Sequence, residues 1–288
     1  MNQVSGSTTL GIIAGRGVYP RVLAESARAQ GVSNLVAFAF KKETDRVIER
    51  HVDQVHWLRL GQLQALLDAI QGSGVKTVVM AGQIKPTHLF HVRMDKALLK
   101  LLGQLRERNA HSIFGAVGDE LRNIGVSLEQ ASLFMESTMP EPGQLAGDTL
   151  TEQEDADVTL GLRVAKVTSQ LDIGQTVVIK AGTILAVEAF EGTDKTIKRA
   201  GDLGGADSVV VKVAKQGHDM RFDIPVIGER TLKMCKRAKV KVLAIEANRT
   251  ILLDRARVIE QAAQNGLKLI AVDVERPQQG DAAVGDTL

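Results

Sequence analysis

The chain has 288 residues, of which 44% are hydrophobic, and at about 150 residues per domain this length predicts two domains that each bury a core. Its 36 Lys and Arg residues balance 34 Asp and Glu residues, and one Trp and one Tyr leave few platforms for stacked bases, so the composition argues against nucleic acid as a partner. The single cysteine rules out an internal disulfide, and neither a signal-peptide pattern nor a run of about 18 apolar residues occurs, so we expect a cytoplasmic protein.

The first half alternates apolar segments with amphipathic ones. Residues 8–14 predict a buried strand, and a glycine loop then leads into an amphipathic helix at residues 20–30. Strands that alternate with helices predict a parallel, Rossmann-like sheet. The other expected strands are 35–40, 54–58 and 77–82, and the other helical patterns are 44–50, 61–71 and much of 85–133.

Two prolines and a glycine between Met139 and Gly143 disfavour a continuing helix and mark the candidate linker. We expect an N-terminal domain with a helical extension at residues 1–144 and a C-terminal domain at 145–288, with a disordered tail from about residue 278. The fold class is therefore α/β, with a Rossmann-like parallel-sheet domain and a second α/β domain that has a mixed sheet. In the second domain we expect a helix at 151–169, a hairpin of 176–180 with 183–189, strands at 208–214, 240–246 and 267–274, and helices at 194–200, 229–238 and 254–264.

Gly15, Arg16 and Gly17 follow the first predicted strand, where a dinucleotide-binding fingerprint would lie. The last glycine of that fingerprint is replaced by Pro20, which favours the first turn of a helix. Amides at the start of that helix can still bind a phosphate or another anion, and a structural tight turn is the alternative. NAD binding is disfavoured because two lysines, rather than an acidic residue, follow the second strand.

Carboxylates cluster between residues 188 and 194. Thr193 is a candidate N-cap of the following helix, whose first amides attract anions. Capping alone would explain Thr193 and Asp194, but it leaves Glu188 and Glu191 without a role. The excess of acid predicts a bound cation, because carboxylate oxygens are ligands for hard divalent ions.

Acids and cations alternate again in the segment that ends at Asp223. If residues 219–224 are extended, Asp219, Arg221 and Asp223 share one face and the apolar residues between them point the other way. Arg221 has the geometry to bind a phosphate, and the alternative is an ion pair with a neighbouring Asp that only shapes the fold. Lys212 falls opposite the valines of its strand, where a solvated lysine is the alternative to a ligand contact. This mixture favours phosphoryl or diphosphate chemistry.

Glu246, Asn248 and Arg249 lie at a turn after an apolar strand. Such turns often contact ligands in open α/β sheets, and they are also common as ordinary turns.

The quoted segments resemble the UDP-2,3-diacylglucosamine pyrophosphatases of lipid A biosynthesis, of the LpxI type, over nearly the whole chain. The glycine-rich opening is the least specific of them, and Arg16 departs from the plainer glycine loop of the family. The carriers are residues 10–17 with Pro20, residues 81–86, Leu-Asp-Ile-Gly-Gln at 171–175, the Glu-Gly-Thr-Asp turn within 186–194, and Arg-Phe-Asp-Ile-Pro-Val-Ile-Gly at 221–228.

The resemblance implies that water splits the diphosphate of UDP-2,3-diacylglucosamine into UMP and 2,3-diacylglucosamine 1-phosphate, with Mg²⁺ as cofactor. It implies an essential Asp223, which we expect to bind the metal or orient the water, with Glu188, Glu191 and Asp194 as further metal ligands. Asp219, Arg221 and Lys212 complete the expected catalytic set. The expected substrate-binding residues are Gly15, Arg16, Gly17, Lys85, Thr193, Lys215, Asn248 and Arg249.

The implied partner is a lipid-linked nucleotide sugar. Because that substrate resides in a membrane, we expect transient contact with the inner face of the inner membrane. Two rival functions remain. The clustered carboxylates argue against a non-catalytic nucleotide-sugar-binding protein, because they would repel a diphosphate. The incomplete glycine loop argues against an NAD(P)-dependent oxidoreductase. The sequence leaves a homodimer open.

Overall fold

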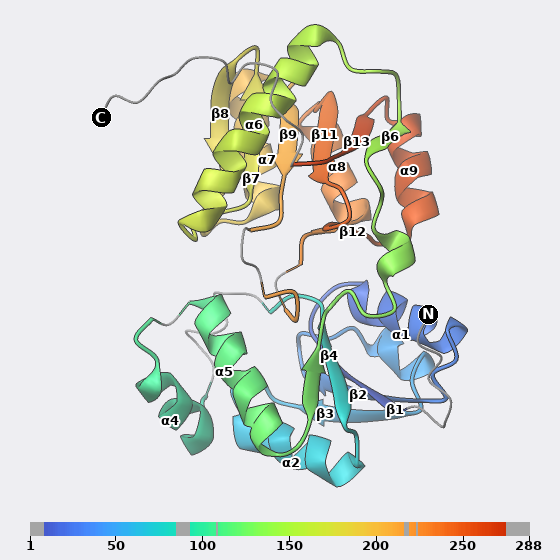
Figure 1. Ribbon diagram of the computed structural model, residues 1–288, viewed down its shortest axis with the longest axis vertical. Coiled ribbons are helices and arrows are strands. Elements are labelled where there is room, and N and C mark those ends of the chain that lie inside the picture. Colours follow the sequence, from blue (N-terminus) through green and yellow to red (C-terminus); the bar gives the residue numbers. More distant parts are fainter. Residues whose placement is uncertain (1–8, 85–92, 108, 216–218, 223, 275–288) are drawn as a thin grey trace. The chain divides into compact units, whose positions relative to one another are not determined.

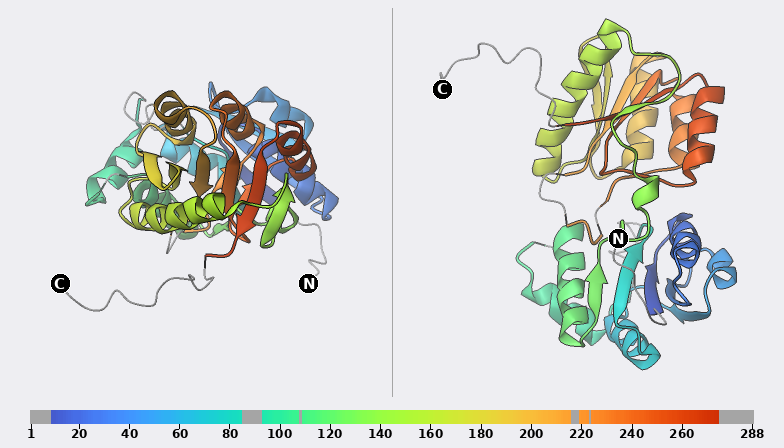
Figure 2. Two further views of the ribbon diagram at one scale, coloured as in Figure 1. Left: turned by 90° about the horizontal axis from the view of Figure 1, so that it is seen from above. Right: turned by 45° about the vertical axis from the view of Figure 1, so that its right-hand side comes forward.

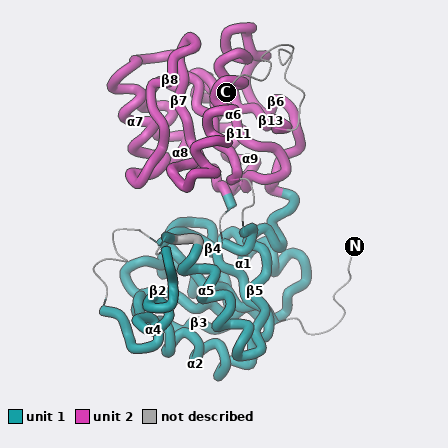
Figure 3. Tube along the Cα trace, turned by 60° about the vertical axis from the view of Figure 1, so that its left-hand side comes forward, with its two compact units in different colours: residues 1–137, 219–224 teal, residues 138–218, 225–288 magenta. Residues whose placement is uncertain are grey.

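The structure, a computed structural model, describes residues 9–84, 93–107, 109–215, 219–222 and 224–274. The chain forms two compact units (Figure 3). Unit 1 comprises residues 1–137 and 219–224, and unit 2 comprises residues 138–218 and 225–288. The chain therefore changes units slightly before the expected boundary, and it returns to unit 1 for one short segment.

Unit 1 is built on a parallel five-stranded sheet with the strand order β3-β2-β1-β4-β5 (Figure 1). The order reverses between β1 and β4, as in Rossmann-like sheets. Residues of β1 and β2 are buried nearly throughout, as expected where helices cover both faces. This sheet confirms the predicted α/β class. The strands are β1 Thr9–Ala14, β2 Asn34–Phe40, β3 Gln54–Leu58, β4 Thr77–Ala81 and β5 Ser127–Glu129.

The helices of unit 1 pack apolar side chains on the sheet. On one face, Phe38 and Val78 of the sheet form a core with Leu67, Leu101 and Leu121 from three different helices. Another helix, α1, contacts β1 and β4. The helical pattern predicted at 44–50 is a 3-10 helix. The helices are α1 Tyr19–Ala29, η1 Arg46–Arg50, α2 Leu63–Ser73, α4 Lys96–Gln104 and α5 Ala110–Asn123.

Residues 219–222 form a turn, so the condition that this segment is extended is not met here. The backbone N–H of Phe222 donates to the carbonyl oxygen of Asp219 at 3.2 Å. The carbonyl oxygen of Met220 accepts from the N–H of Ala131 at 2.7 Å, and the Phe222 ring lies 5.8 Å from the Phe114 ring, between centroids. These contacts with unit 1 override the local alternation of polar and apolar residues.

Unit 2 contains a six-stranded mixed sheet with the order β6-β13-β11-β9-β7-β8. The three central strands β13, β11 and β9 are parallel, whereas β6, β7 and β8 each run antiparallel to the neighbour they pair with. Strand β6 begins at Gly143, the last residue of the segment expected to be linker. The strands are β6 Gly143–Ala146, β7 Thr176–Lys180, β8 Thr183–Val187, β9 Val209–Lys212, β11 Val242–Glu246 and β13 Lys268–Val272, with a separate parallel pair of β10 Val226–Ile227 and β12 Ile251–Leu252.

Helices cover both faces of this sheet: α6 lies on one face, and α7, α8 and α9 lie on the other (Figure 2). The valines of β9 alternate between the two cores, with Val209 and Val211 toward α6 and Val210 toward the opposite helices. The side chain after Val211 therefore belongs to the α7 side. The helices are α6 Glu152–Gln170, α7 Thr193–Gly204, α8 Glu229–Arg237 and α9 Arg255–Gln264.

Candidate functional site

Polar side chains gather at the carboxyl edge of the unit 2 sheet. Strands β9 and β11 are parallel and pair Lys212 with Ile245, so Lys212 and Glu246 end neighbouring strands. Strand β8 runs in the same direction and is followed by Glu188. Open α/β sheets bind ligands at the carboxyl ends of their strands. We therefore take this edge as the candidate site.

Lys212 is buried, with 7% of its surface exposed, so the alternative of a solvated lysine does not hold. Its Nζ donates a 3.0 Å hydrogen bond to Oγ1 of Thr193, the first residue of α7. The Thr193 hydroxyl in turn donates to Oε1 of Glu188 at 3.0 Å. A single hydroxyl thus links a buried ammonium group with a buried carboxylate, and it fixes the position of both.

Glu188 retains one oxygen that this network does not use. The residue is 8% exposed, and its Oε2 is buried with no hydrogen-bond partner among the described residues. Burying a carboxylate oxygen without a partner is costly, so a site that keeps one is suited to a bound cation or to a ligand that donates a proton.

Gly174 fixes the backbone of Glu188 from the neighbouring turn. A Cβ added at Gly174 would lie 2.1 Å from the carbonyl oxygen of Glu188. The carbonyl of Gly174 accepts a hydrogen bond from Oγ1 of Thr168 at 3.1 Å, and the N–H of Glu188 donates to the carbonyl of Thr176 at 2.8 Å. Because both backbones are tethered, a glycine is required at residue 174.

Replacing Gly174 by Ala is expected to lower the free energy of unfolding by about 1–3 kcal/mol, since overpacking forces the backbone at Glu188 to move. Urea unfolding measures the change. Gly72→Ala in α2 is the matched control, because a Cβ there meets open space and a helical Gly→Ala change stabilises by up to about 1 kcal/mol. An unchanged unfolding midpoint for Gly174→Ala would contradict this account of Glu188.

The other two acids of the Glu-Gly-Thr-Asp turn are engaged by arginines. Oε1 of Glu191 lies 2.8 Å from Nη2 of Arg199, and this hydrogen bond is the main reason that the pKa of Glu191 is lowered. Asp194 forms an ion pair with Nε of Arg230 at the start of α8. Of the three predicted metal ligands in this turn, Glu188 fits a cation best.

The described residues contain no group of three or more His, Cys, Asp or Glu side chains that could share a metal ion. Asp223, the fourth predicted ligand, and Lys85, a predicted substrate-binding residue, lie outside the described residues. The cation site therefore stays a prediction. Of the other predicted site residues, unit 2 contains Glu188, Glu191, Thr193, Asp194, Lys212, Lys215, Asn248 and Arg249, whereas unit 1 contains Gly15, Arg16, Gly17, Asp219 and Arg221.

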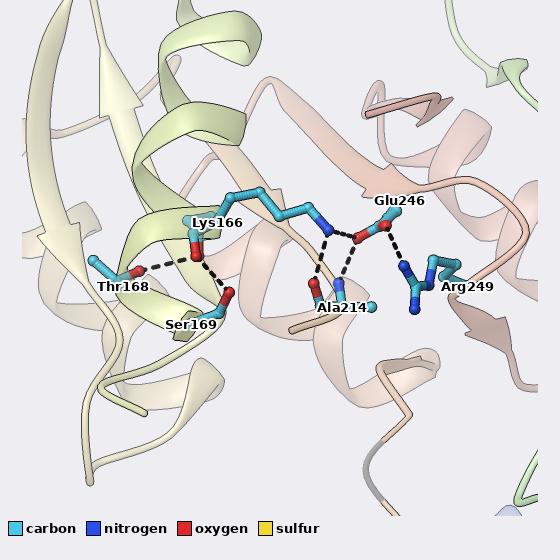
Figure 4. Close-up of polar contacts among 7 residues, drawn as sticks. Lys166, Thr168, Ser169, Ala214, Glu246 and Arg249 are labelled. Atoms are coloured by element: carbon cyan, nitrogen blue, oxygen red, sulfur yellow. Dashed lines mark hydrogen bonds and ion pairs between the residues drawn. The ribbon is translucent and has the colours of Figure 1, made fainter. Parts of the chain in front are cut away.

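A second polar cluster at the same edge centres on Glu246 and includes a lysine that sequence reasoning missed (Figure 4). Oε2 of Glu246 accepts hydrogen bonds from Nζ of Lys166 and from the N–H of Ala214, both at 2.7 Å. Nη1 of Arg249 lies 3.7 Å from Oε1. Lys166 is one of several cations in an amphipathic helix, and no local pattern distinguishes it.

Two further predicted binding residues lie near this cluster along the chain. Lys215 follows Ala214 and forms an ion pair with Asp172, in the turn after α6. Asn248 adopts a left-handed backbone with φ of 55°, and its N–H donates to the carbonyl of Pro140 at 2.8 Å. The turn after β11 is therefore held by backbone hydrogen bonding, which leaves the exposed Asn248 side chain accessible.

The glycine loop of unit 1 packs against the end of a neighbouring strand. The N–H of Gly15 donates to the carbonyl of Ala81 at 2.7 Å, and Arg16 and Gln83 exchange backbone hydrogen bonds of 2.7 and 3.1 Å. A Cβ added at Gly15 would lie 2.9 Å from the carbonyl oxygen of Gln83. Two amides of the loop are thus used by the protein, which favours the tight-turn alternative over a phosphate cradle.

Arg221 forms an ion pair with Asp219, which is the arrangement given above as the alternative to a phosphate contact. Its Nε lies 2.8 and 3.0 Å from the two carboxylate oxygens, and this contact is the main reason that the pKa of the guanidinium is raised further. The guanidinium also rests on α5, where a Cβ added at Gly118 would lie 3.1 Å from its Nη1. Together with Arg122, it lines a hollow beside α5.

Comparison with known families matches both parts of the chain. Residues 9–138 match the LpxI N-terminal domain, and residues 141–270 match the LpxI C-terminal domain. The chain is 32% identical over 285 residues to the UDP-2,3-diacylglucosamine pyrophosphatase LpxI of Caulobacter vibrioides, covering 93% of this chain and 99% of that protein. The two domain matches meet within a few residues of the division between units.

Similarity to solved structures is weak. N5-carboxyaminoimidazole ribonucleotide synthetase is 11% identical, with a TM-score of 0.29 over 72% of this chain and 47% of that one. The biotin carboxylase domain of the Hydrogenobacter thermophilus 2-oxoglutarate carboxylase is also 11% identical, with a TM-score of 0.27 over 67% of this chain and 40% of that one. The chain spans less than half of either protein, and neither likeness bears on function.

Proposed function

The chain belongs to the LpxI family, and we propose on this premise that it hydrolyses the diphosphate of UDP-2,3-diacylglucosamine in lipid A biosynthesis. The products are UMP and 2,3-diacylglucosamine 1-phosphate. The observation that carries the proposal is the 32% identity to a protein named UDP-2,3-diacylglucosamine pyrophosphatase, whose length is matched over 99%.

The polar edge of unit 2 supports chemistry on a diphosphate. In the proposed reaction a water oxygen bonds to one phosphorus, the bridging P–O bond breaks, and the water proton leaves to solvent or a carboxylate. The ammonium of Lys212 and the start of α7 supply positive charge for the phosphate oxygens. No described side chain caps α7, so its first amides are suited to an anion.

We propose Mg²⁺ as the cofactor. Among the described residues its ligand would be Oε2 of Glu188, which is buried and has no hydrogen-bond partner there. The proposed role of Asp223 rests on the family resemblance alone. Glu191 and Asp194 are weaker candidates, because their charges are already paired with Arg199 and Arg230. When bound, the ion would offset the negative charge of the diphosphate.

The test is to incubate the purified protein with UDP-2,3-diacylglucosamine and Mg²⁺ and to separate the products by chromatography. We expect UMP and 2,3-diacylglucosamine 1-phosphate in equal amounts, loss of the activity with EDTA, and recovery when Mg²⁺ is restored. Substrate binding without UMP release would instead identify a nucleotide-sugar-binding protein. Binding of NAD(P)H without hydrolysis would identify an oxidoreductase.

We also propose transient contact with a membrane surface beside the candidate site. No helix among the described residues has the length and apolar character to cross a bilayer. Leu171, in the turn after α6, is 66% exposed, and Phe190, in the turn after β8, is 69% exposed. The close approach of Gly174 to Glu188 places these two turns side by side. Exposed apolar side chains at this place fit the acyl chains of a lipid surface.

Leu171→Ser combined with Phe190→Ser is expected to reduce flotation with vesicles of phosphatidylethanolamine and phosphatidylglycerol by about threefold or more, since apolar contact drives such binding. Leu203→Ser is the matched control, because Leu203 is also 66% exposed but lies near the far end of α7. The proposal fails if the wild type does not float with any of these vesicles, or if the control reduces flotation equally.

A further inference from the structure

Lys166 and Glu246 connect three elements at the carboxyl edge of the unit 2 sheet. Lys166 reaches from α6, Glu246 ends β11, and Ala214 lies just beyond β9. Nζ of Lys166 lies 2.7 Å from Oε2 of Glu246 and 2.9 Å from the carbonyl oxygen of Ala214. The N–H of Ala214 closes the triangle by donating to the same Oε2 at 2.7 Å (Figure 4).

The two strand ends held by this triangle lead directly to predicted substrate cations. Lys215 follows Ala214, and Arg249 lies three residues after Glu246. The Arg249 side chain is 41% exposed and stands 3.7 Å from Oε1 of Glu246, too far for a hydrogen bond. It is therefore oriented by the Glu246 carboxylate and remains accessible to an anion.

The pair is poorly explained by stability alone. The Glu246 side chain is 5% exposed and the Lys166 side chain is 17% exposed. Desolvation of two charges offsets most of their attraction, so buried ion pairs are weak contributors to stability and often can be replaced by apolar residues. A carboxylate beside a phosphate site would also repel the substrate, and Lys166 neutralises it at contact distance.

We propose that Lys166 is a positioning residue for substrate binding, a role that rests on the proposed function. With Glu246 it fixes the end of β9 against the end of β11, so that Arg249, and Lys215 once it exchanges Asp172 for the substrate, present their charges to the diphosphate in one geometry. Lys166 itself does not contact the substrate.

The experiment compares steady-state UMP release by the wild type, Lys166→Met and Lys166→Arg. Lys166→Met should raise KM about tenfold while kcat stays within about threefold, because the loss is one of uniform binding. Lys166→Arg, which keeps the charge and the donors, should restore KM to within about twofold. A structural role alone would reduce the folded fraction, which lowers the apparent kcat and leaves KM unchanged.

Two further variants keep the test decisive. Arg163→Met removes an exposed cation from the same helix and should leave KM unchanged. If Lys166→Met does not fold, Lys166→Met combined with Glu246→Leu removes the unpaired carboxylate and should fold with the same raised KM. If either folded variant has the same KM as the wild type, the role of Lys166 is contradicted and the proposed function still stands. If the wild-type protein releases no UMP, both the proposed function and this role are contradicted.

Discussion

Replacing Asp223 by Ala is expected to lower the turnover of UDP-2,3-diacylglucosamine by about 10²-fold or more. Phosphoryl transfer depends on positioning and charge neutralisation, and the family resemblance assigns Asp223 as its essential acid. Folding should be preserved, because the described residues of this segment contact unit 1 through the Met220 carbonyl and the Phe222 ring, which the substitution leaves in place. Initial rates of UMP release measure kcat, and urea unfolding checks the fold.

Asp219→Ala provides the comparison within the same segment. The carboxylate of Asp219 is already paired with Arg221, at 2.8 and 3.0 Å from its Nε. We expect this variant to lose less than about tenfold in turnover, since its charge acts on Arg221 rather than on the reacting atoms. A folded Asp223→Ala protein with full turnover, or a larger loss for Asp219→Ala, would contradict the central place given to Asp223.

The strands of both sheets could be predicted where apolar runs lie between turn-forming residues. The segments 54–58 and 176–180 form strands with the expected bounds, β3 and β7. Long apolar runs are most informative for strands covered on both faces, such as β1 and β2, because nearly all of their residues are buried. The mixed sheet of unit 2 follows from the same signal, since the predicted hairpin of β7 and β8 brings an antiparallel pair to parallel strands.

Short edge strands could not be predicted, because pairing rather than composition creates them. Strand β5 is Ser-Leu-Glu and pairs with β4, and strand β6 is Gly-Gln-Leu-Ala and pairs with β13. Neither has the length or the β-branched residues that identify a strand locally. The conformation of residues 219–222 could not be predicted for a different reason. Their alternation of polar and apolar residues is typical of a strand, but tertiary contacts such as that between Ala131 and Met220 impose a turn.

The site was predictable to the extent that its residues are close in sequence. Glu188 and Thr193 belong to one turn, and the structure joins them by a hydrogen bond of 3.0 Å. Lys166 and Glu246 are 80 residues apart, and only the packing of α6 on the sheet brings them together. The burial of Lys212 could not be predicted, because the alternation of residues along a strand shows which face each side chain lies on but not whether that face is covered. Here the start of a helix covers the face that carries Lys212.

Replacing Lys212 by Met is expected to lower turnover by about 10²-fold, the cost typical of losing one preorganised group that stabilises developing negative charge. The Lys212 ammonium is held by the Thr193 hydroxyl before any substrate arrives, so it needs no reorganisation during the reaction. Methionine fills similar space, which should keep the fold. The measurement is kcat from UMP release, with the urea midpoint as a check on folding.

Lys180→Met is the matched control for Lys212, because Lys180 ends the adjacent strand β7 at the opposite edge of the sheet. Its Nζ donates to the carbonyl of Gly204 at 2.7 Å, so its loss tests the removal of a hydrogen-bonded lysine far from the site. Thr193→Val should give an intermediate loss, since it keeps the ammonium but removes the hydroxyl that holds it, and Thr193→Ser should restore activity. If Lys180→Met and Lys212→Met lose turnover equally, charge at the carboxyl edge is not what the reaction requires.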